Sequence, residues 1–256
     1  MTPRTTRRVG IDGPTGPLEV VLNAPETTPA GIALVAHPHS LQGGTLDNKV
    51  VQTLAKTFYA LGYAVVRFNF RGVGASGGSF DDGVGETDDA LTVLAYARGA
   101  LGDALPIVLA GFSFGSFVQS RVAQRITPQR MVLVGPAVQR FPVEHVPADT
   151  IVIHGEDDDI VPLADVLAWA RPQHLPAVGV VVLGLQIDAP RLHGRLGDAE
   201  RLQALLHGGH GGGVGPLRLA RHLGARLGDD GDHGHVGHRP AHVLAVALTR
   251  VEGGDP

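Results

Sequence analysis

The order of apolar and polar residues predicts strands that alternate with helices over the first 184 positions. Continuous apolar runs of strand length stand at 18–25, 31–40, 63–70, 106–111, 130–137, 149–155 and 177–184. Between them, apolar residues recur at helical spacing in 47–62, 86–101, 113–126 and 162–173. Strands that are apolar throughout are typical of a parallel sheet covered on both faces. The pattern therefore predicts an α/β fold with helices on both sides of a mostly parallel sheet.

Helix and loop boundaries are also visible. Asp47 is placed to cap the helix 47–62, and Gly62 is placed to end it. The stretch 71–85, "RGVGASGGSFDDGVG", is predicted to be a glycine-rich loop. Ligands of parallel sheets bind at the carboxyl ends of the strands. His37, Ser113 and the loops after Phe70 and His154 all follow strand ends, so they are expected to converge at one edge.

Ser113 is the strongest candidate for chemistry. It stands at the centre of Gly-Phe-Ser-Phe-Gly, between the strand "IVLAG" and a helix. This G-x-S-x-G pattern at a strand-to-helix turn is typical of a nucleophile elbow, in which Gly111 and Gly115 relieve crowding. The alternative is an ordinary serine in a glycine-rich turn.

A carboxylate is needed to orient a catalytic histidine, and the stretch "IVIHGEDDDIVP" (151–162) offers three successive aspartates. Asp158 is preferred over Asp157 and Asp159 because it stands three residues after Gly155. A solvated acidic loop is the alternative. His154 is expected to lie beneath the site rather than to act as the base.

Acyl transfer also requires two backbone N–H groups that bind an oxyanion. The residue after the nucleophile, Phe114, is one candidate. His39, in the loop after the strand that ends at Ala36, is the other, with Ser40 as the competing choice. His37 is expected to brace this loop, and a metal pair of His37 and His39 is the less favoured interpretation because no third ligand stands nearby.

Four stretches in this order, "AHPHSLQGGTLDNKVV", "GYAVVRFNFRGVGASGGSF", "GFSFGS" and "VIHGEDDDIVP", resemble the α/β-hydrolase superfamily. More narrowly they are similar to its small, lidless, dienelactone-hydrolase-like bacterial members, over about residues 15–183. The resemblance implies an eight-stranded or trimmed sheet without a lid. It also implies ester hydrolysis through an acyl-serine, with no cofactor and no metal. Arg71, in the glycine-rich loop, is expected to be a structural ion-pair partner.

The histidine that completes this constellation is hard to place. The resemblance implies a histidine shortly after the last strand, near residues 187–190, and none is there. His193 is the nearest and precedes an amphipathic segment, 194–206, so it is the candidate base. The alternative is that His193 is incidental and the base is missing.

The composition changes after Trp169. From Arg171 to Pro256 there is no aromatic residue, Lys, Ser or Asn, and seven of the thirteen histidines fall between His207 and His242. We therefore expect a hydrolase domain over 1–205 and a Gly/His-rich, poorly ordered tail over 206–256. One hypothesis for the residues from about 184 onward is a GC-rich coding strand translated out of frame. A metal-binding tail is the alternative, although its irregular spacings and glycines offer no rigid ligand frame.

The remaining composition narrows the partners. The net charge of −4 gives no reason to expect nucleic acid or an anionic membrane. The chain has no cysteine, which excludes disulfides and thiolate chemistry. No secretion signal and no apolar run of about 20 residues is present, so a cytoplasmic protein acting on a small ester is expected. The competing interpretations are a non-catalytic protein that has lost its base, and a hydrolase of amides or lactones or an acyltransferase.

Overall fold

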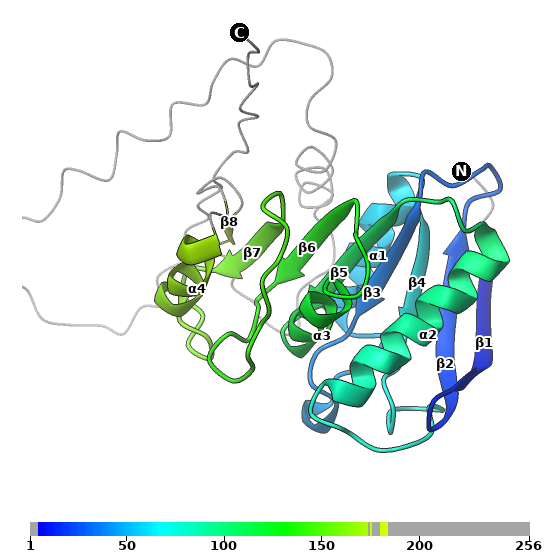
Figure 1. Ribbon diagram of the computed structural model, residues 1–256, viewed down its shortest axis with the longest axis horizontal. Coiled ribbons are helices and arrows are strands. Elements are labelled where there is room, and N and C mark those ends of the chain that lie inside the picture. Colours follow the sequence, from blue (N-terminus) through cyan, green and yellow to red (C-terminus); the bar gives the residue numbers. More distant parts are fainter. Residues whose placement is uncertain (1–4, 174, 176–179, 184–256) are drawn as a thin grey trace, which may run out of the picture.

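The computed structural model describes residues 5–173, 175 and 180–183. Eight strands form one sheet in the order β1-β2-β4-β3-β5-β6-β7-β8. β1 pairs antiparallel with β2, β2 pairs antiparallel with β4, and every later pair is parallel. The predicted α/β-hydrolase architecture, a mostly parallel sheet between helices, is confirmed (Figure 1).

The strands coincide closely with the apolar runs. In chain order they are β1 (Thr5–Gly13), β2 (Gly16–Ala24), β3 (Ile32–Ala36), β4 (Ala64–Phe68), β5 (Ile107–Phe112), β6 (Arg130–Val134), β7 (Ile151–Gly155) and β8 (Val180–Leu183). The helices are α1 (Lys49–Ala60), α2 (Val84–Leu101), α3 (Phe114–Val122) and α4 (Leu163–Ala170), with short 3₁₀ turns η1 (Ser40–Gln42) and η2 (Arg171–Gln173).

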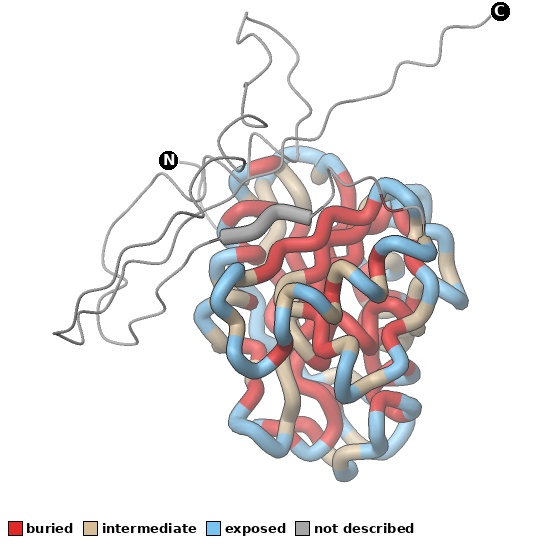
Figure 2. Tube along the Cα trace, turned by 90° about the vertical axis from the view of Figure 1, so that its left-hand side faces the viewer, coloured by how far each residue is buried: buried red, intermediate tan, exposed pale blue. Residues whose placement is uncertain are grey.

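Two apolar cores lie on the two faces of the sheet. Alternate strand residues such as Leu34, Leu109 and Leu133 pack with α2, α3 and α4 in the larger core. Their neighbours in sequence, such as Val35 and Val108, pack with α1 in the smaller one. Because both faces are covered, β3 is buried along its whole length and β4, β5 and β6 are buried at most positions. Buried segments, drawn in red, run through the middle of the molecule in Figure 2.

The structure corrects three details of the predicted elements. Strand β1 was missed, because it is an edge strand whose residues are exposed or half-buried and so carries no continuous apolar run. The N-cap of α1 is Asn48, whose side chain accepts the N–H of Val50; Asp47 instead forms ion pairs with Arg8 and Arg67.

Helix α3 ends at Val122, four residues earlier than predicted. The amides of Gln124 and Arg125 donate to carbonyls three residues back, so the chain tightens out of the helix there. The predicted stop at Gly62 is confirmed by its φ of 85° and by its N–H, which donates to the carbonyl of Tyr59.

The connection between β6 and β7 is sixteen residues long and contains neither a helix nor a strand. No lid is therefore evident in the described part of the chain. Among all the residues that the structure describes, no helix is both long and apolar enough to cross a bilayer. The predicted tail, 206–256, lies outside the described residues, so the domain boundary at 205 stays a prediction.

Candidate active site

Ser113 occupies the turn between β5 and α3 with a strained backbone. Its φ of 53° and ψ of −115° are unusual for a residue with a side chain. The conformation is held by a hydrogen bond from its N–H to the carbonyl of Val134 on β6, at 2.8 Å. Ser113 is half-buried and stands at the carboxyl edge of the sheet. These are the features that the elbow interpretation of Ser113 requires.

The two glycines of the motif make this turn possible. A Cβ on Gly111 would lie 2.4 Å from the carbonyl carbon and oxygen of Gly115. A Cβ on Gly115 would lie 2.5 Å from the carbonyl oxygen of Ala36 and 2.7 Å from that of His37. All of these separations are too short for a Cβ atom, so neither position accepts a side chain. Glycine therefore lets helix α3 approach its own strand and the loop after β3.

This close approach brings together the two candidate oxyanion donors. Ala36 pairs with Gly111 across β3 and β5, so the loop after Ala36 begins beside the elbow. Phe114 is the first residue of α3, and the first N–H groups of a helix have no partner within it. His39 follows on the adjacent loop, directly before η1. The structure thus places the backbones of His39 and Phe114 in one region.

His37 has both ring nitrogens in hydrogen bonds. Nε2 accepts the N–H of Phe70 at 3.1 Å, and Nδ1 lies 2.6 Å from the carbonyl oxygen of Pro38. Only the neutral ring with its proton on Nδ1 satisfies both. Burial lowers its pKa to about 4, in keeping with this tautomer. His37 therefore fastens the loop after β3 to the loop after β4, and it has no lone pair left for a metal.

The ring of His39 also has a defined tautomer. Its Nδ1 accepts the N–H of Leu41 at 3.2 Å, so the neutral ring carries its proton on Nε2. Burial is the largest influence on its pKa, which is lowered. With Nε2 protonated, the side chain of His39 can donate a hydrogen bond but cannot take the proton of Ser113.

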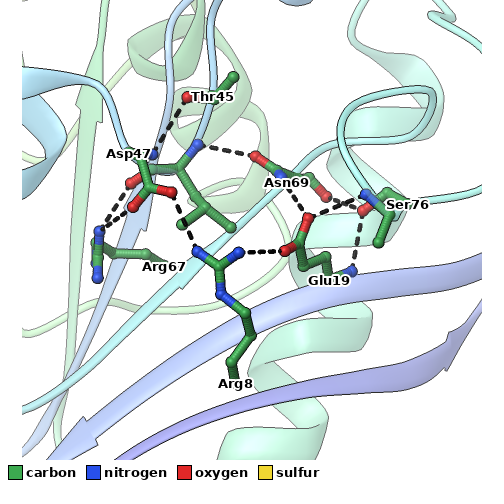
Figure 3. Close-up of polar contacts among 9 residues, drawn as sticks. Arg8, Glu19, Thr45, Asp47, Arg67, Asn69 and Ser76 are labelled. Atoms are coloured by element: carbon green, nitrogen blue, oxygen red, sulfur yellow. Dashed lines mark hydrogen bonds and ion pairs between the residues drawn. The ribbon is translucent and has the colours of Figure 1, made fainter.

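A polar network around Asn69 holds the loop between β3 and α1 (Figure 3). Buried Asn69 accepts the N–H of Leu46 through Oδ1 and donates to Glu19 through Nδ2, at 2.8 and 2.7 Å. Glu19 also binds Arg8, and Ser76 donates to the carbonyl of Asn69 at 2.8 Å. This role of Asn69 was not predicted from the sequence, although a polar residue between Phe68 and Phe70 in an apolar run was a signal of it.

Among the three aspartates of the acid loop, Asp158 differs from its neighbours. Its Oδ1 accepts the N–H groups of Ile160 and Val161, both at 2.9 Å, whereas Asp157 and Asp159 are exposed. One carboxylate oxygen is thereby fixed by the turn, which leaves Oδ2 for another donor. The geometry favours Asp158 as the residue that orients a histidine.

His154 lies beneath this loop, as expected. It is buried, and its Nε2 is 2.7 Å from the carbonyl oxygen of Val161. Since a carbonyl can only accept, Nε2 carries the proton and holds the end of the acid loop in place. His154 is therefore occupied as a support for the turn that presents Asp158.

Arg71 forms the expected structural ion pair. Its guanidinium binds Asp89 through Nε and Nη2, at 3.0 and 2.8 Å, and Nη2 also donates to the carbonyl of Gly85. The hydrogen bonds to buried Asp89 raise the pKa of Arg71. The pair fixes the glycine-rich loop to α2 and is not directed at a substrate.

His193, the candidate base, lies outside the described residues. Within residues 5–173, no imidazole is hydrogen-bonded to the hydroxyl of Ser113. His37, His154 and His145 have ring nitrogens engaged with Pro38, Val161 and Gln173, respectively. In that range, no group of three or more His, Cys, Asp or Glu side chains is arranged to hold a metal ion.

Comparison with known proteins supports the α/β-hydrolase fold. Residues 40–148 match the family model described as serine aminopeptidase, S33. A lidless α/β serine hydrolase from Xanthomonas campestris is 40% identical, with a TM-score of 0.62 over 67% of this chain and 81% of that one. An α/β serine hydrolase homologue from Coxiella burnetii is 38% identical, with a TM-score of 0.61 over 67% of this chain and 82% of that one. An uncharacterised protein from Rickettsia prowazekii is 34% identical over 166 residues, which are 62% of this chain and 70% of the relative.

The fold and these matches define the class of the protein, a hydrolase. The chain belongs to the α/β-hydrolase superfamily. Its narrower resemblance to dienelactone hydrolases stays a prediction.

Proposed function

We propose that this protein hydrolyses small carboxylic esters through an acyl-serine intermediate, with Ser113 as the nucleophile. The observation that carries the proposal is the strained conformation of Ser113 at the first turn of α3, held by the N–H···O bond to Val134. Such strain is kept where the surrounding structure requires it, and an exposed nucleophile is the established use of this turn.

The reaction has two stages. The Oγ of Ser113 attacks the ester carbonyl carbon while its proton passes to an imidazole, and the backbone N–H groups of His39 and Phe114 stabilise the oxyanion. Collapse of this intermediate breaks the bond to the alcohol, which leaves with the proton from the imidazole. Water then attacks the acyl-serine and gives its proton to the same imidazole. The bond from the acyl carbon to Oγ breaks, the acid is released, and Oγ of Ser113 takes the proton back from the imidazole.

The base in this proposal is His193, oriented by Oδ2 of Asp158. Activity should be weak and should rise with pH through about 6 to 7, as an imidazole loses its proton. The His193→Ala variant should lose most of this activity. Full activity in that variant would assign the base to another histidine.

The test is hydrolysis of p-nitrophenyl acetate and butyrate by the wild type and by Ser113→Ala. Loss of a triad member lowers turnover by a factor of roughly 10⁴ to 10⁶. Ser120→Ala is a matched control, since Ser120 lies on the same helix and donates to the carbonyl of Phe117. Activity of Ser113→Ala within about tenfold of the wild type would contradict the proposal.

Two other functions also have a specific observation in their favour. The match of residues 40–148 to a serine aminopeptidase model favours amide hydrolysis, which aminoacyl p-nitroanilides would report. A non-catalytic protein is the other, because no histidine stands near residues 187–190, where the resemblance implies the base. It would bind esters without consuming them.

A further inference from the structure

Beside the candidate nucleophile lies a cluster of rings formed by His39, Phe80, Phe114 and Phe141, here called the aromatic wall. The ring of His39 stacks on Phe80 with 4.7 Å between centroids and lies 5.1 Å from Phe114 and 5.7 Å from Phe141. Phe114 is 5.5 Å from Phe80 and 5.0 Å from Phe141. The four rings therefore form one connected cluster, in which Phe141 also stacks on buried Phe117 at 5.2 Å.

The members of the wall come from separate loops. His39 follows β3, Phe80 follows β4, Phe114 follows Ser113 on α3, and Phe141 follows β6. Phe114 is fully buried, whereas the other three rings remain half-buried. Phe114 belongs to the larger apolar core, and Phe80 and Phe141 pack against that core. Three half-buried rings thus lie around a buried one, Phe114, which directly follows the candidate nucleophile.

The wall is also uncharged at neutral pH. His39 is held as a neutral ring by its hydrogen bond from Leu41 and by burial, which lowers its pKa. Charges of both signs lie around it, with Arg140 lowering the pKa of His39 and Glu86 and Asp82 raising it. No single sign dominates, so the surface does not select a charged group.

Exposed apolar side chains gather at the same edge of the sheet. Of the residues that the structure describes, the large apolar side chains that are exposed are Leu41, Val84 and Ile160. Leu41 is two residues after His39, Val84 is the first residue of α2, and Ile160 is in the acid loop. All three stand on segments that follow the carboxyl ends of strands, the edge that also carries Ser113.

From these observations we propose that the aromatic wall binds the acyl group of the substrate, and that the preferred esters carry an uncharged arylalkyl acyl chain. The proposal rests on the hydrolase function proposed above. An aryl ring gains both apolar burial and ring–ring contact on this surface, whereas an acetyl group gains neither.

The experiment compares two esters with the same leaving group, p-nitrophenyl 3-phenylpropanoate and p-nitrophenyl acetate. For each enzyme the measured quantity is the ratio of the two kcat/KM values. Phe80→Leu and Phe141→Leu keep apolar volume and remove the ring, and Phe80→Ala removes it more fully. Tyr96→Ala is the control, because Tyr96 is a half-buried aromatic on α2, about three turns from the start of that helix.

The wild type should favour the arylalkyl ester. The ratio should fall by about twofold to tenfold in the Phe80 and Phe141 variants, the range that an aromatic pair worth about 0.5–1.5 kcal/mol beyond area burial gives. Tyr96→Ala should keep the wild-type ratio. An unchanged ratio in the wall variants of an active enzyme would overturn the assignment of the wall while leaving the esterase proposal intact.

A second measurement needs no turnover. Binding of the product acid, 3-phenylpropanoate, is followed by calorimetry in the wild type and in Phe80→Leu, with acetate as the reference ligand. If no ester is hydrolysed but 3-phenylpropanoate binds and is weakened by Phe80→Leu, the wall assignment stands and the catalytic proposal fails. If it does not bind, and Phe80→Leu instead lowers the mass measured by light scattering, the wall is an interface between copies and the inference is wrong.

Discussion

The Nε2 atom of His37 accepts the backbone N–H of Phe70 at 3.1 Å, and this hydrogen bond joins the loop after β3 to the loop after β4. The bond requires an unprotonated Nε2. Burial lowers the pKa of His37 from 6.5 to about 4, because a charged imidazole would lose its hydration there. The loop that carries the candidate oxyanion donor is thus held by a histidine that stays neutral.

This relationship predicts how stability depends on pH. The unfolded chain binds a proton at His37 below about pH 6.5, whereas the folded protein does so only near pH 4. The free energy of unfolding should therefore fall as the pH drops through this window, by about 2 kcal/mol at pH 5 from His37 alone. Urea denaturation at pH 7.5 and pH 5.0 measures the difference.

His37→Gln should remove that part of the pH dependence, because an amide can make both hydrogen bonds without titrating. His145→Gln is the control at a histidine that is exposed. Titration of the wild-type ring followed by NMR gives an independent value. A His37 pKa near 6.5 in the folded protein would show that the ring is not held as described.

A pair of glycine substitutions tests the close approach at the elbow. Gly115→Ala should lower the urea concentration at which the protein unfolds, because its Cβ would lie 2.5 Å from the carbonyl oxygen of Ala36. The same variant should lose covalent labelling of Ser113 by a fluorophosphonate probe. Gly99→Ala on α2 has no neighbour within 4 Å of its Cβ and should stabilise the protein by about 0.5–1 kcal/mol. Equal effects of the two substitutions on the unfolding midpoint would show that packing at Gly115 is looser than described.

Asp158→Asn should lower turnover by about 10⁴-fold, since an amide orients the wrong tautomer of a catalytic histidine. Asp157→Asn and Asp159→Asn are matched controls in the same turn and should stay close to the wild type, because both residues are exposed. Turnover with a p-nitrophenyl ester measures all three. If Asp157→Asn or Asp159→Asn lowers turnover and Asp158→Asn does not, the assignment of Asp158 as the acid is wrong.

Much of the fold was predictable because burial on both faces leaves a simple pattern. Strands β3, β5 and β7 are continuous apolar runs, and their ends placed Ser113 and Asp158 at one edge. Strand β1 was not predictable in this way, since an edge strand shows half of its residues to solvent.

The sequence could not show which residues meet between loops. The aromatic wall joins rings that are up to about a hundred positions apart, from His39 to Phe141. No spacing along the chain predicts such a contact. Asn69 was overlooked for the same reason, because its partners Glu19 and Leu46 lie on other segments. His193 stays a prediction from the resemblance alone.

The central claim is that Ser113 is an activated nucleophile, and covalent labelling by a fluorophosphonate probe tests it most directly. Such a probe reacts with a serine whose hydroxyl is deprotonated by a base during attack. The account predicts that intact mass rises by one probe adduct, that peptide mapping places the adduct on Ser113, and that Ser113→Ala is unlabelled while Ser120→Ala is labelled like the wild type. No adduct at any pH between 6 and 9, or an adduct on another serine, would contradict it.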